Sequence, residues 1–346
     1  MDPSLKLLIT CCRYCYGAES RASVAQTFGG ADLERLLTLS RRHRVQGLAW
    51  KAVNDSGVPL PLEVGAAFRK DAQRIAQNGL QAAAVSARLH HAFGSARVPM
   101  LFLKGLVLGR LAWGDPFLKS SIDIDILVPE AAISSAAALL AGLDFEQTLP
   151  EPSVDPVDWH RRRKESGWTG HGVTLDLHSR VADNRRLLPT LTARTRADLV
   201  EVAPGISLPT FPLAEQVAYL AVHGASSAWF RLKWLAEFAA LLHPIPPAGI
   251  ANLRIQAIQL GAGRAIDQAL VLAHKLFATP VPDELEFDAP TRRLVRIARA
   301  QLEAEREPTA RPLGTATIHF SQLLLRPGSR FAFGELGRQV GDILTR

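Results

Sequence analysis

The sequence of 346 residues contains little cysteine. Its three cysteines, Cys11, Cys12 and Cys15, all fall within one five-residue stretch. An odd and closely spaced set does not frame a disulfide-bonded secreted fold, and no second Cys-x-x-Cys pair follows that would complete a structural zinc site. We therefore expect a reducing, cytoplasmic environment.

Long apolar runs are missing as well. No window approaches the roughly 20 consecutive apolar residues that a membrane-spanning helix needs. The first residues, MDPSLKLLITCC, carry Asp2 early and lack a small-residue cleavage site. The sequence thus predicts neither a signal peptide nor a membrane span.

Several catalytic signatures are also absent. The sequence has no G-x-G-x-x-G fingerprint, no Walker A loop and no serine or cysteine nucleophile motif. With 47% hydrophobic and 21% charged residues, the composition is that of an ordinary globular protein and excludes a disordered one. The 40 Lys and Arg exceed the 33 Asp and Glu, so the net charge is +7. This balance suits an anionic ligand such as a nucleotide, a nucleic acid or an acidic lipid surface, and equally a merely soluble protein.

The pattern of apolar residues divides the chain into three regions. Residues 1–95 show helical spacing, residues 96–208 alternate strand-length apolar runs with short helices, and residues 209–346 return to helical spacing. We expect a mixed α+β fold, in which a mixed β-sheet core is flanked by N-terminal and C-terminal helical segments. Within the last region, residues 213–242 and residues 251–277 are each predicted to form one helix.

The most informative segment is the predicted strand at residues 122–128. Asp123 and Asp125 are two residues apart and project from the same face of the strand. Two like charges side by side repel, so the pair indicates a divalent cation, and removing one charge should relieve the repulsion. The alternative is an edge strand with a solvated acidic face.

Two neighbouring features favour the metal site. Lys104 and Gly105 join a predicted strand at residues 98–103 to a predicted helix at residues 106–113, a geometry in which backbone N–H groups meet phosphate. An ammonium group at the end of a buried strand needs an anion. A bound triphosphate would supply that anion. When no nucleotide is bound, a carboxylate of the Asp-x-Asp strand would be the partner of Lys104 instead. Asp176 adds a third carboxylate, in the predicted strand at residues 173–178.

Four basic side chains are further candidates. His178 follows Asp176 by two residues and shares its face, so it orients the carboxylate or moves the acceptor's proton, unless it is merely a hydrogen-bonded strand histidine. His223 and Arg231 are eight residues apart on the predicted helix and lie roughly on one face, with Lys233 off that face. These residues either reach the phosphates or the acceptor, or belong to a packed helix.

The segment at residues 103–130, LKGLVLGRLAWGDPFLKSSIDIDILVPE, resembles the core of the DNA polymerase β-like nucleotidyltransferase superfamily. More narrowly, it is similar to a bacterial family of uncharacterised nucleotidyltransferases. That family's pattern has a strand ending in Leu-Lys-Gly, a turn with proline and a basic residue (here Lys119), and Asp-x-Asp. It continues with a strand bearing Asp-Leu-His (residues 176–178) and a helix with His-Gly-Ala followed by Trp-x-Arg-Leu-Lys-Trp-Leu (residues 223–235).

The resemblance implies an enzyme that uses an NTP and Mg²⁺ (or Mn²⁺) to transfer an NMP to an acceptor. It implies that Asp123, Asp125 and Asp176 hold the metal and act in catalysis. Leu106 stands where the superfamily favours serine or a second glycine after the first glycine, so Lys104 and the backbone must bind the phosphate without a hydroxyl group. The residues expected to contact the nucleotide are Lys104, Gly105, Lys119, His178, His223 and Lys233.

The acceptor remains open among a small molecule, a peptide, a protein and an RNA. Two other functions also remain: a catalytically degenerate nucleotide-binding regulatory protein, and a toxin-like nucleotidyltransferase that modifies tRNA. Nucleic acid is a partner that the basic run from Arg161 to Lys164 permits, although no nucleic-acid motif supports it.

Overall fold

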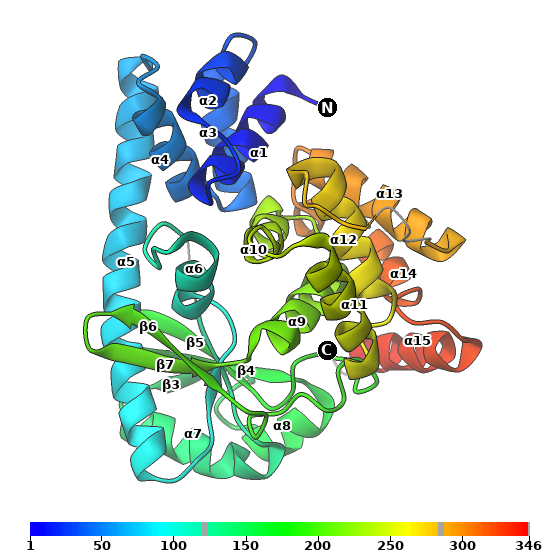
Figure 1. Ribbon diagram of the computed structural model, residues 1–346. Helices are drawn as coiled ribbons and strands as arrows, with labels where there is room; N and C mark the ends of the chain where they lie inside the picture. Colours follow the sequence, from blue (N-terminus) through cyan, green and yellow to red (C-terminus); the bar gives the residue numbers. More distant parts are fainter. Residues whose placement is uncertain (120–122, 283–286, 345–346) are drawn as a thin grey trace. The chain divides into compact units, whose positions relative to one another are not determined.

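The computed structural model describes residues 1–119, 123–282 and 287–344, and these residues form fifteen α-helices and two β-sheets (Figure 1). The mixed α+β class predicted from the sequence is confirmed. The helices are α1 (Pro3–Cys15), α2 (Arg21–Phe28), α3 (Leu33–His43), α4 (Gln46–Ser56), α5 (Leu62–Ser95), α6 (Leu106–Trp113), α7 (Ile133–Gly142), α8 (Pro156–Arg162), α9 (Leu213–Ser226), α10 (Leu232–Leu242), α11 (Pro247–Leu260), α12 (Arg264–Phe277), α13 (Ala289–Glu303), α14 (Ala316–Gln322) and α15 (Ser329–Leu344). The strands are β1 (Leu101–Phe102), β2 (Asp123–Leu127), β3 (Glu146–Leu149), β4 (Glu165–Gly170), β5 (Val173–His178), β6 (Asp198–Ala203) and β7 (Ile206–Thr210).

The chain divides into two compact units. Residues 1–71 and 217–346 form the first, in which the described residues are helical or irregular, and residues 72–216 form the second, which holds both sheets. The unit boundaries fall within α5 and α9. These units are sets of segments that pack together, so they differ in kind from the three regions at residues 1–95, 96–208 and 209–346, which differ in their apolar spacing. The boundaries of the three regions remain a prediction.

The larger sheet has the strand order β1-β2-β5-β4-β3. β2 runs parallel to β5 and antiparallel to β1, while the other pairs are antiparallel. The Asp-x-Asp strand therefore has a neighbour on each side, and the alternative of a solvated edge strand is wrong. The side chain of Asp125 is also not solvated, because only 3% of this residue's surface is exposed.

Strict alternation along β2 and β5 sorts their side chains onto two faces. One face carries Ile124, Ile126, Leu175 and Leu177, which join α5 and α7 in a buried core. The polar residues between them therefore project from the other face. Ile122, the first residue of the strand predicted at residues 122–128, lies outside the described residues.

The helix predicted over residues 213–242 is wrong, because α9 ends at Ser226 and α10 begins at Leu232. Ala228 and Trp229 between them adopt left-handed backbone angles, with φ of 48° and 53°. The fully buried Trp229 ring packs onto Gly224, where an added Cβ would lie 2.4 Å from the ring. Burial of Trp229 thus ends α9.

The helix predicted over residues 251–277 is divided too, because Gly261 and Gly263 have φ of 100° and 58° between α11 and α12. The helix at residues 106–113 and the strand at residues 173–178 match their predicted bounds. Among the described helices, none combines the length and the apolar character that crossing a membrane requires.

Candidate active site

The turn at Lys104 and Gly105 needs a backbone conformation that favours glycine. Gly105 is the N-cap of α6 with φ 69° and ψ −127°, a region that favours glycine because it has no Cβ. Lys104, Gly105 and the first residues of α6 line a narrow cavity together with Asp123 and Asp125. The structure therefore brings the predicted phosphate-binding turn to the predicted metal site.

The carboxylates meet across the two parallel strands. Asp125 is the register partner of Asp176, and Asp123 lies opposite Thr174. Asp123 and Asp176 are half-buried, whereas Asp125 is buried. The three carboxylates thus share one face at the centre of the sheet.

Asp125 is the electrostatic centre of this group. The Lys104 ammonium nitrogen lies 2.8 Å from its Oδ1, and His178 Nε2 donates a hydrogen bond to the same oxygen over 3.1 Å. Burial alone would raise the pKa of Asp125, but the Lys104 charge and the His178 hydrogen bond outweigh burial and hold that pKa well below its usual range. The resting partner that the sequence predicted for Lys104 is therefore present. Within the described residues, Oδ2 accepts no hydrogen bond, and it is the oxygen left for a ligand.

Asp176 has the opposite environment. Burial, and then the negative charge of Asp125, raise its pKa from 3.8 to about 7. Asp125 is thus stabilised as an anion, whereas ionising Asp176 beside it costs free energy. A cation placed between the two carboxylates would remove that cost.

The residues present fit a divalent metal ion. Asp125, Asp176 and His178 each offer a ligand atom, and these atoms lie within 4.8 Å of one another. Carboxylate oxygens are the ligands that Mg²⁺ and Mn²⁺ prefer. His178 Nδ1 is buried without a hydrogen bond from any described residue, whereas its Nε2 bonds Asp125. The donor set suits carboxylate ligation, with His178 as the group that orients Asp125.

A fourth carboxylate at the site was missed in the sequence. Glu165 begins β4 as the register partner of His178, and its Oε2 lies 3.4 Å from His178 Nδ1. Lys164 forms an ion pair with Glu165. Burial would raise the pKa of Glu165, but the Lys164 charge lowers it to about 2. His178 therefore lies between the carboxylates of Asp125 and Glu165, while Lys164, predicted as part of a basic run, is neutralised.

The other predicted nucleotide contacts are more scattered. Lys119 precedes β2 and is 6% exposed. His223 lies on α9, with its ring 5.9 Å from that of Tyr219 and 5.4 Å from that of Trp234, and Lys233 lies on α10. The sequence predicted one helix for His223 and Lys233, but they lie on two different helices. Both residues belong to the first unit. The roles of these three residues remain predictions.

No curated protein matches the chain. The model of a family described as uncharacterised nucleotidyltransferase matches residues 29–278, which is well over half of the sequence and includes the carboxylates, Lys104, His178, His223 and Lys233. The chain therefore belongs to this family of nucleotidyltransferases.

Proposed function

We propose that the protein is a metal-dependent nucleotidyltransferase of the DNA polymerase β-like type, which transfers an NMP from an NTP to an acceptor. The observation that carries this proposal is the cross-strand pairing of Asp125 with Asp176 beside Asp123. Two like charges side by side, one buried and one half-buried, do not stabilise a sheet, whereas they suit the binding of a divalent cation. Membership of a nucleotidyltransferase family supports the same chemistry.

Asp123, Asp125 and Asp176 would hold the metal, Mg²⁺ or Mn²⁺. When bound, the metal neutralises charge on the triphosphate and lowers the pKa of the attacking group. His178 keeps Asp125 oriented through the Nε2 hydrogen bond, and Glu165 flanks His178 from β4. The protein thus supplies rigid carboxylates on two central strands.

The remaining residues of the site bind and orient the nucleotide. Lys104 and the backbone N–H groups that follow Gly105 contact phosphate oxygens, because Leu106 offers no hydroxyl group. An oxygen of the acceptor attacks the α-phosphorus, the bond from that phosphorus to the bridging oxygen breaks, and pyrophosphate leaves. Lys119, His223 and Lys233 are proposed as further contacts to the phosphates or the acceptor, which is a small molecule, a peptide, a protein or an RNA.

The reaction is tested by incubating the protein with cell extract, Mg²⁺ or Mn²⁺, and NTPs labelled at either the α- or the γ-phosphate. We expect label to pass to an acceptor from the α-phosphate only, and EDTA to prevent it. Transfer from the γ-phosphate would show a phosphoryl transferase instead. Metal-dependent NTP binding without transfer would identify a degenerate regulatory protein, and label in tRNA would identify a tRNA-modifying enzyme.

Lys104→Met should weaken NTP binding by about one to two decades, because a charge-assisted hydrogen bond to phosphate contributes roughly 1.5–3 kcal/mol. Because Lys104 also forms an ion pair with Asp125, the same substitution should affect metal affinity in the opposite direction from NTP affinity. Mn²⁺ alone should bind at least as tightly to the variant, because the metal no longer competes with the ammonium group. Both affinities are measured by calorimetry, with the unphosphorylated nucleoside as a control that should bind both proteins alike. Equal NTP affinity in the two proteins would restrict Lys104 to its ion pair.

A further inference from the structure

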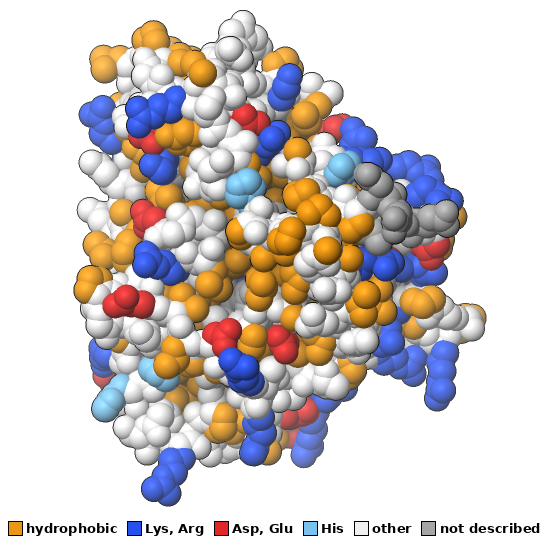
Figure 2. Space-filling model, viewed as in Figure 1, with side chains coloured by type: hydrophobic (Ala, Val, Ile, Leu, Met, Phe, Trp, Pro, Cys, Tyr) orange, Lys and Arg blue, Asp and Glu red, His pale blue; other side chains and the backbone are white. Residues whose placement is uncertain are grey.

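His160 on α8 is a buried titratable residue outside the group of side chains that would hold the metal and the nucleotide. Only 1% of its surface is exposed, whereas Figure 2 shows histidine side chains that reach the surface of the molecule. Its ring Nδ1 lies 2.9 Å from Ser179 Oγ, and its Nε2 lies 3.0 Å from Ser166 Oγ. Ser166 belongs to β4 and Ser179 directly follows β5. One buried ring thus joins α8 to two strands of the larger sheet.

The hydrogen bonds around His160 run in one direction. The carbonyl of Lys164 can only accept, and the Ser179 hydroxyl donates to it over 3.4 Å. Ser179 Oγ therefore accepts from His160 Nδ1, which carries the ring hydrogen. Nε2 of the neutral ring is then an acceptor for the Ser166 hydroxyl, while Ser166 Oγ accepts from Trp168 Nε1 over 3.0 Å. Burial lowers the pKa of His160 to about 4, which agrees with the neutral ring that this order requires.

The two serines are the chain neighbours of two residues of the candidate active site. Ser166 follows Glu165 and Ser179 follows His178, and Glu165 is the register partner of His178. Because successive side chains of a strand point to opposite faces, the serines and the ring of His160 lie behind the sheet. Glu165 and His178 project from the front, the face that carries the three carboxylates. A hydrogen-bonded ring behind both backbones therefore fixes where the two side chains in front of them point.

Other contacts hold α8 at the same strand ends. Trp159 Nε1 donates to the carbonyl of Glu165 over 2.7 Å. Arg180 donates to the carbonyls of His160 and Arg162 over 2.7 and 2.8 Å. None of these bonds uses the imidazole ring, so α8 keeps its place on the sheet when the ring is replaced.

We propose that His160 is a positioning residue for nucleotidyl transfer, an inference that rests on the proposed function. Through the two serines it keeps His178 Nε2 on Asp125 Oδ1 and keeps Glu165 beside the His178 ring. The ring itself contacts neither the metal nor the nucleotide. β1 and the phosphate-binding turn that follows it are separated from β4 by β2 and β5, so NTP binding should not depend on His160.

The test variant is His160→Phe, which keeps a buried ring and removes both hydrogen bonds to the serines. Loss of a hydrogen bond that orients a metal ligand typically costs about tenfold to a hundredfold in activity. We therefore expect the rate of α-phosphate label transfer in cell extract at saturating NTP to fall by about tenfold or more, with the half-saturating NTP concentration unchanged. Ser179→Ala is a smaller change that should give the same split, and it covers the case in which His160→Phe does not fold.

A second readout does not require transfer. The full chain is labelled with nitrogen-15 in histidine and studied by nuclear magnetic resonance in EDTA without NTP. The ring resonances of His178, assigned from the spectrum of His178→Gln, should shift in His160→Phe, because the ring is no longer held on Asp125.

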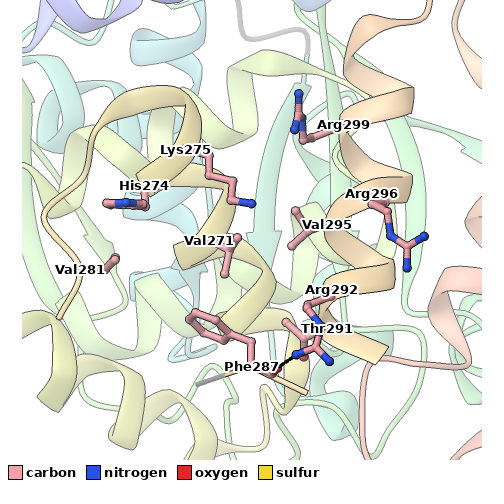
Figure 3. A pocket seen from close by; sticks show the side chains of 10 residues that line it. All are labelled: Val271, His274, Lys275, Val281, Phe287, Thr291, Arg292, Val295, Arg296 and Arg299. Carbon is pink, nitrogen blue, oxygen red and sulfur yellow. Dashed lines mark hydrogen bonds between the residues drawn. The ribbon is translucent and has the colours of Figure 1, made fainter. Parts of the chain in front are cut away.

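Thr291→Val is the matched control. Thr291 is also 1% exposed, and its hydroxyl donates to Asp288 Oδ1 over 2.6 Å at the start of α13, in the first unit (Figure 3). The control should lower the melting temperature, as His160→Phe does, but should change neither the rate of transfer nor the His178 resonances.

A lower melting temperature of His160→Phe with an unchanged transfer rate and unchanged His178 resonances would overturn the proposal, because His160 would then only stabilise the fold. If the parent shows no transfer, the proposed function fails instead. The His178 resonances then decide by themselves whether His160 positions that ring: a shift supports it, and an unaltered spectrum overturns it.

Discussion

Replacing Asp176 with asparagine should abolish nucleotidyl transfer and, in the absence of metal and nucleotide, make the protein more stable. Burial and the charge of Asp125 raise the pKa of Asp176 to about 7, so the folded protein holds this carboxylate at a cost once it ionises. Each pKa unit corresponds to 1.36 kcal/mol, so we expect a gain of about 2–4 kcal/mol at pH 8. Urea denaturation with EDTA measures the stability, and α-phosphate label measures the transfer.

The pH dependence gives the sign of this effect independently. The unfolded chain releases the Asp176 proton near pH 3.8, while the folded protein keeps it until about pH 7. The folded state binds more protons in that window, so the contribution of Asp176 to stability falls as the pH rises from about 4 to about 7. Asp176→Asn should lack this component, and saturating Mn²⁺ should suppress it in the parent. A variant that is less stable than the parent at pH 8 would contradict the assignment.

Asp125→Asn should also abolish transfer, but it should make the protein less stable. The carboxylate is buried and neutralises Lys104, whose side chain is 15% exposed, and it accepts the hydrogen bond of His178. Breaking a buried ion pair from one side typically costs about 3–5 kcal/mol, because the remaining charge is left without its partner. The sequence predicts that removing the charge of Asp125 relieves repulsion and so stabilises the fold. The ion pair with Lys104 makes the expected change in stability negative instead.

Asp123→Asn is the matched control for this effect. It removes the same charge from the same strand, at a half-buried position two residues away. We expect metal-dependent NTP binding to be lost in both variants, with the larger loss of stability in Asp125→Asn, because Asp125 is the more deeply buried carboxylate. Melting temperatures without ligand and calorimetric NTP titrations separate the two quantities. A melting temperature of Asp125→Asn equal to that of the parent would show that the Lys104–Asp125 contact does not stabilise the fold.

The parts of the site that the sequence predicts are those encoded locally. The alternation around Asp123 and Asp125 identifies their shared face, and the run at residues 173–178 identifies β5 with its bounds. Glycine before a helical pattern likewise indicates the Gly105 turn. Each of these signals depends on residues within one short segment.

The parts that the sequence does not predict depend on distant contacts. Glu165 reaches His178 only because β4 pairs with β5, and the strand Glu-Ser-Gly-Trp-Thr-Gly has too little alternation to be recognised. The break after Ser226 has no glycine or proline within it, since burial of Trp229 against Gly224 produces it. Tertiary packing therefore decides these features.

The discontinuous first unit has a consequence for the order of folding during synthesis. Residues 72–216 are contiguous and hold Lys104, Asp123, Asp125, Asp176 and His178, so this unit can fold as soon as it has left the ribosome. The first unit cannot do so, because α1 packs on α10 and α12, which are made more than 200 residues later. Nascent chains arrested beyond residue 216 should therefore acquire a protease-resistant fragment containing the three carboxylates before the N-terminal helices become protected.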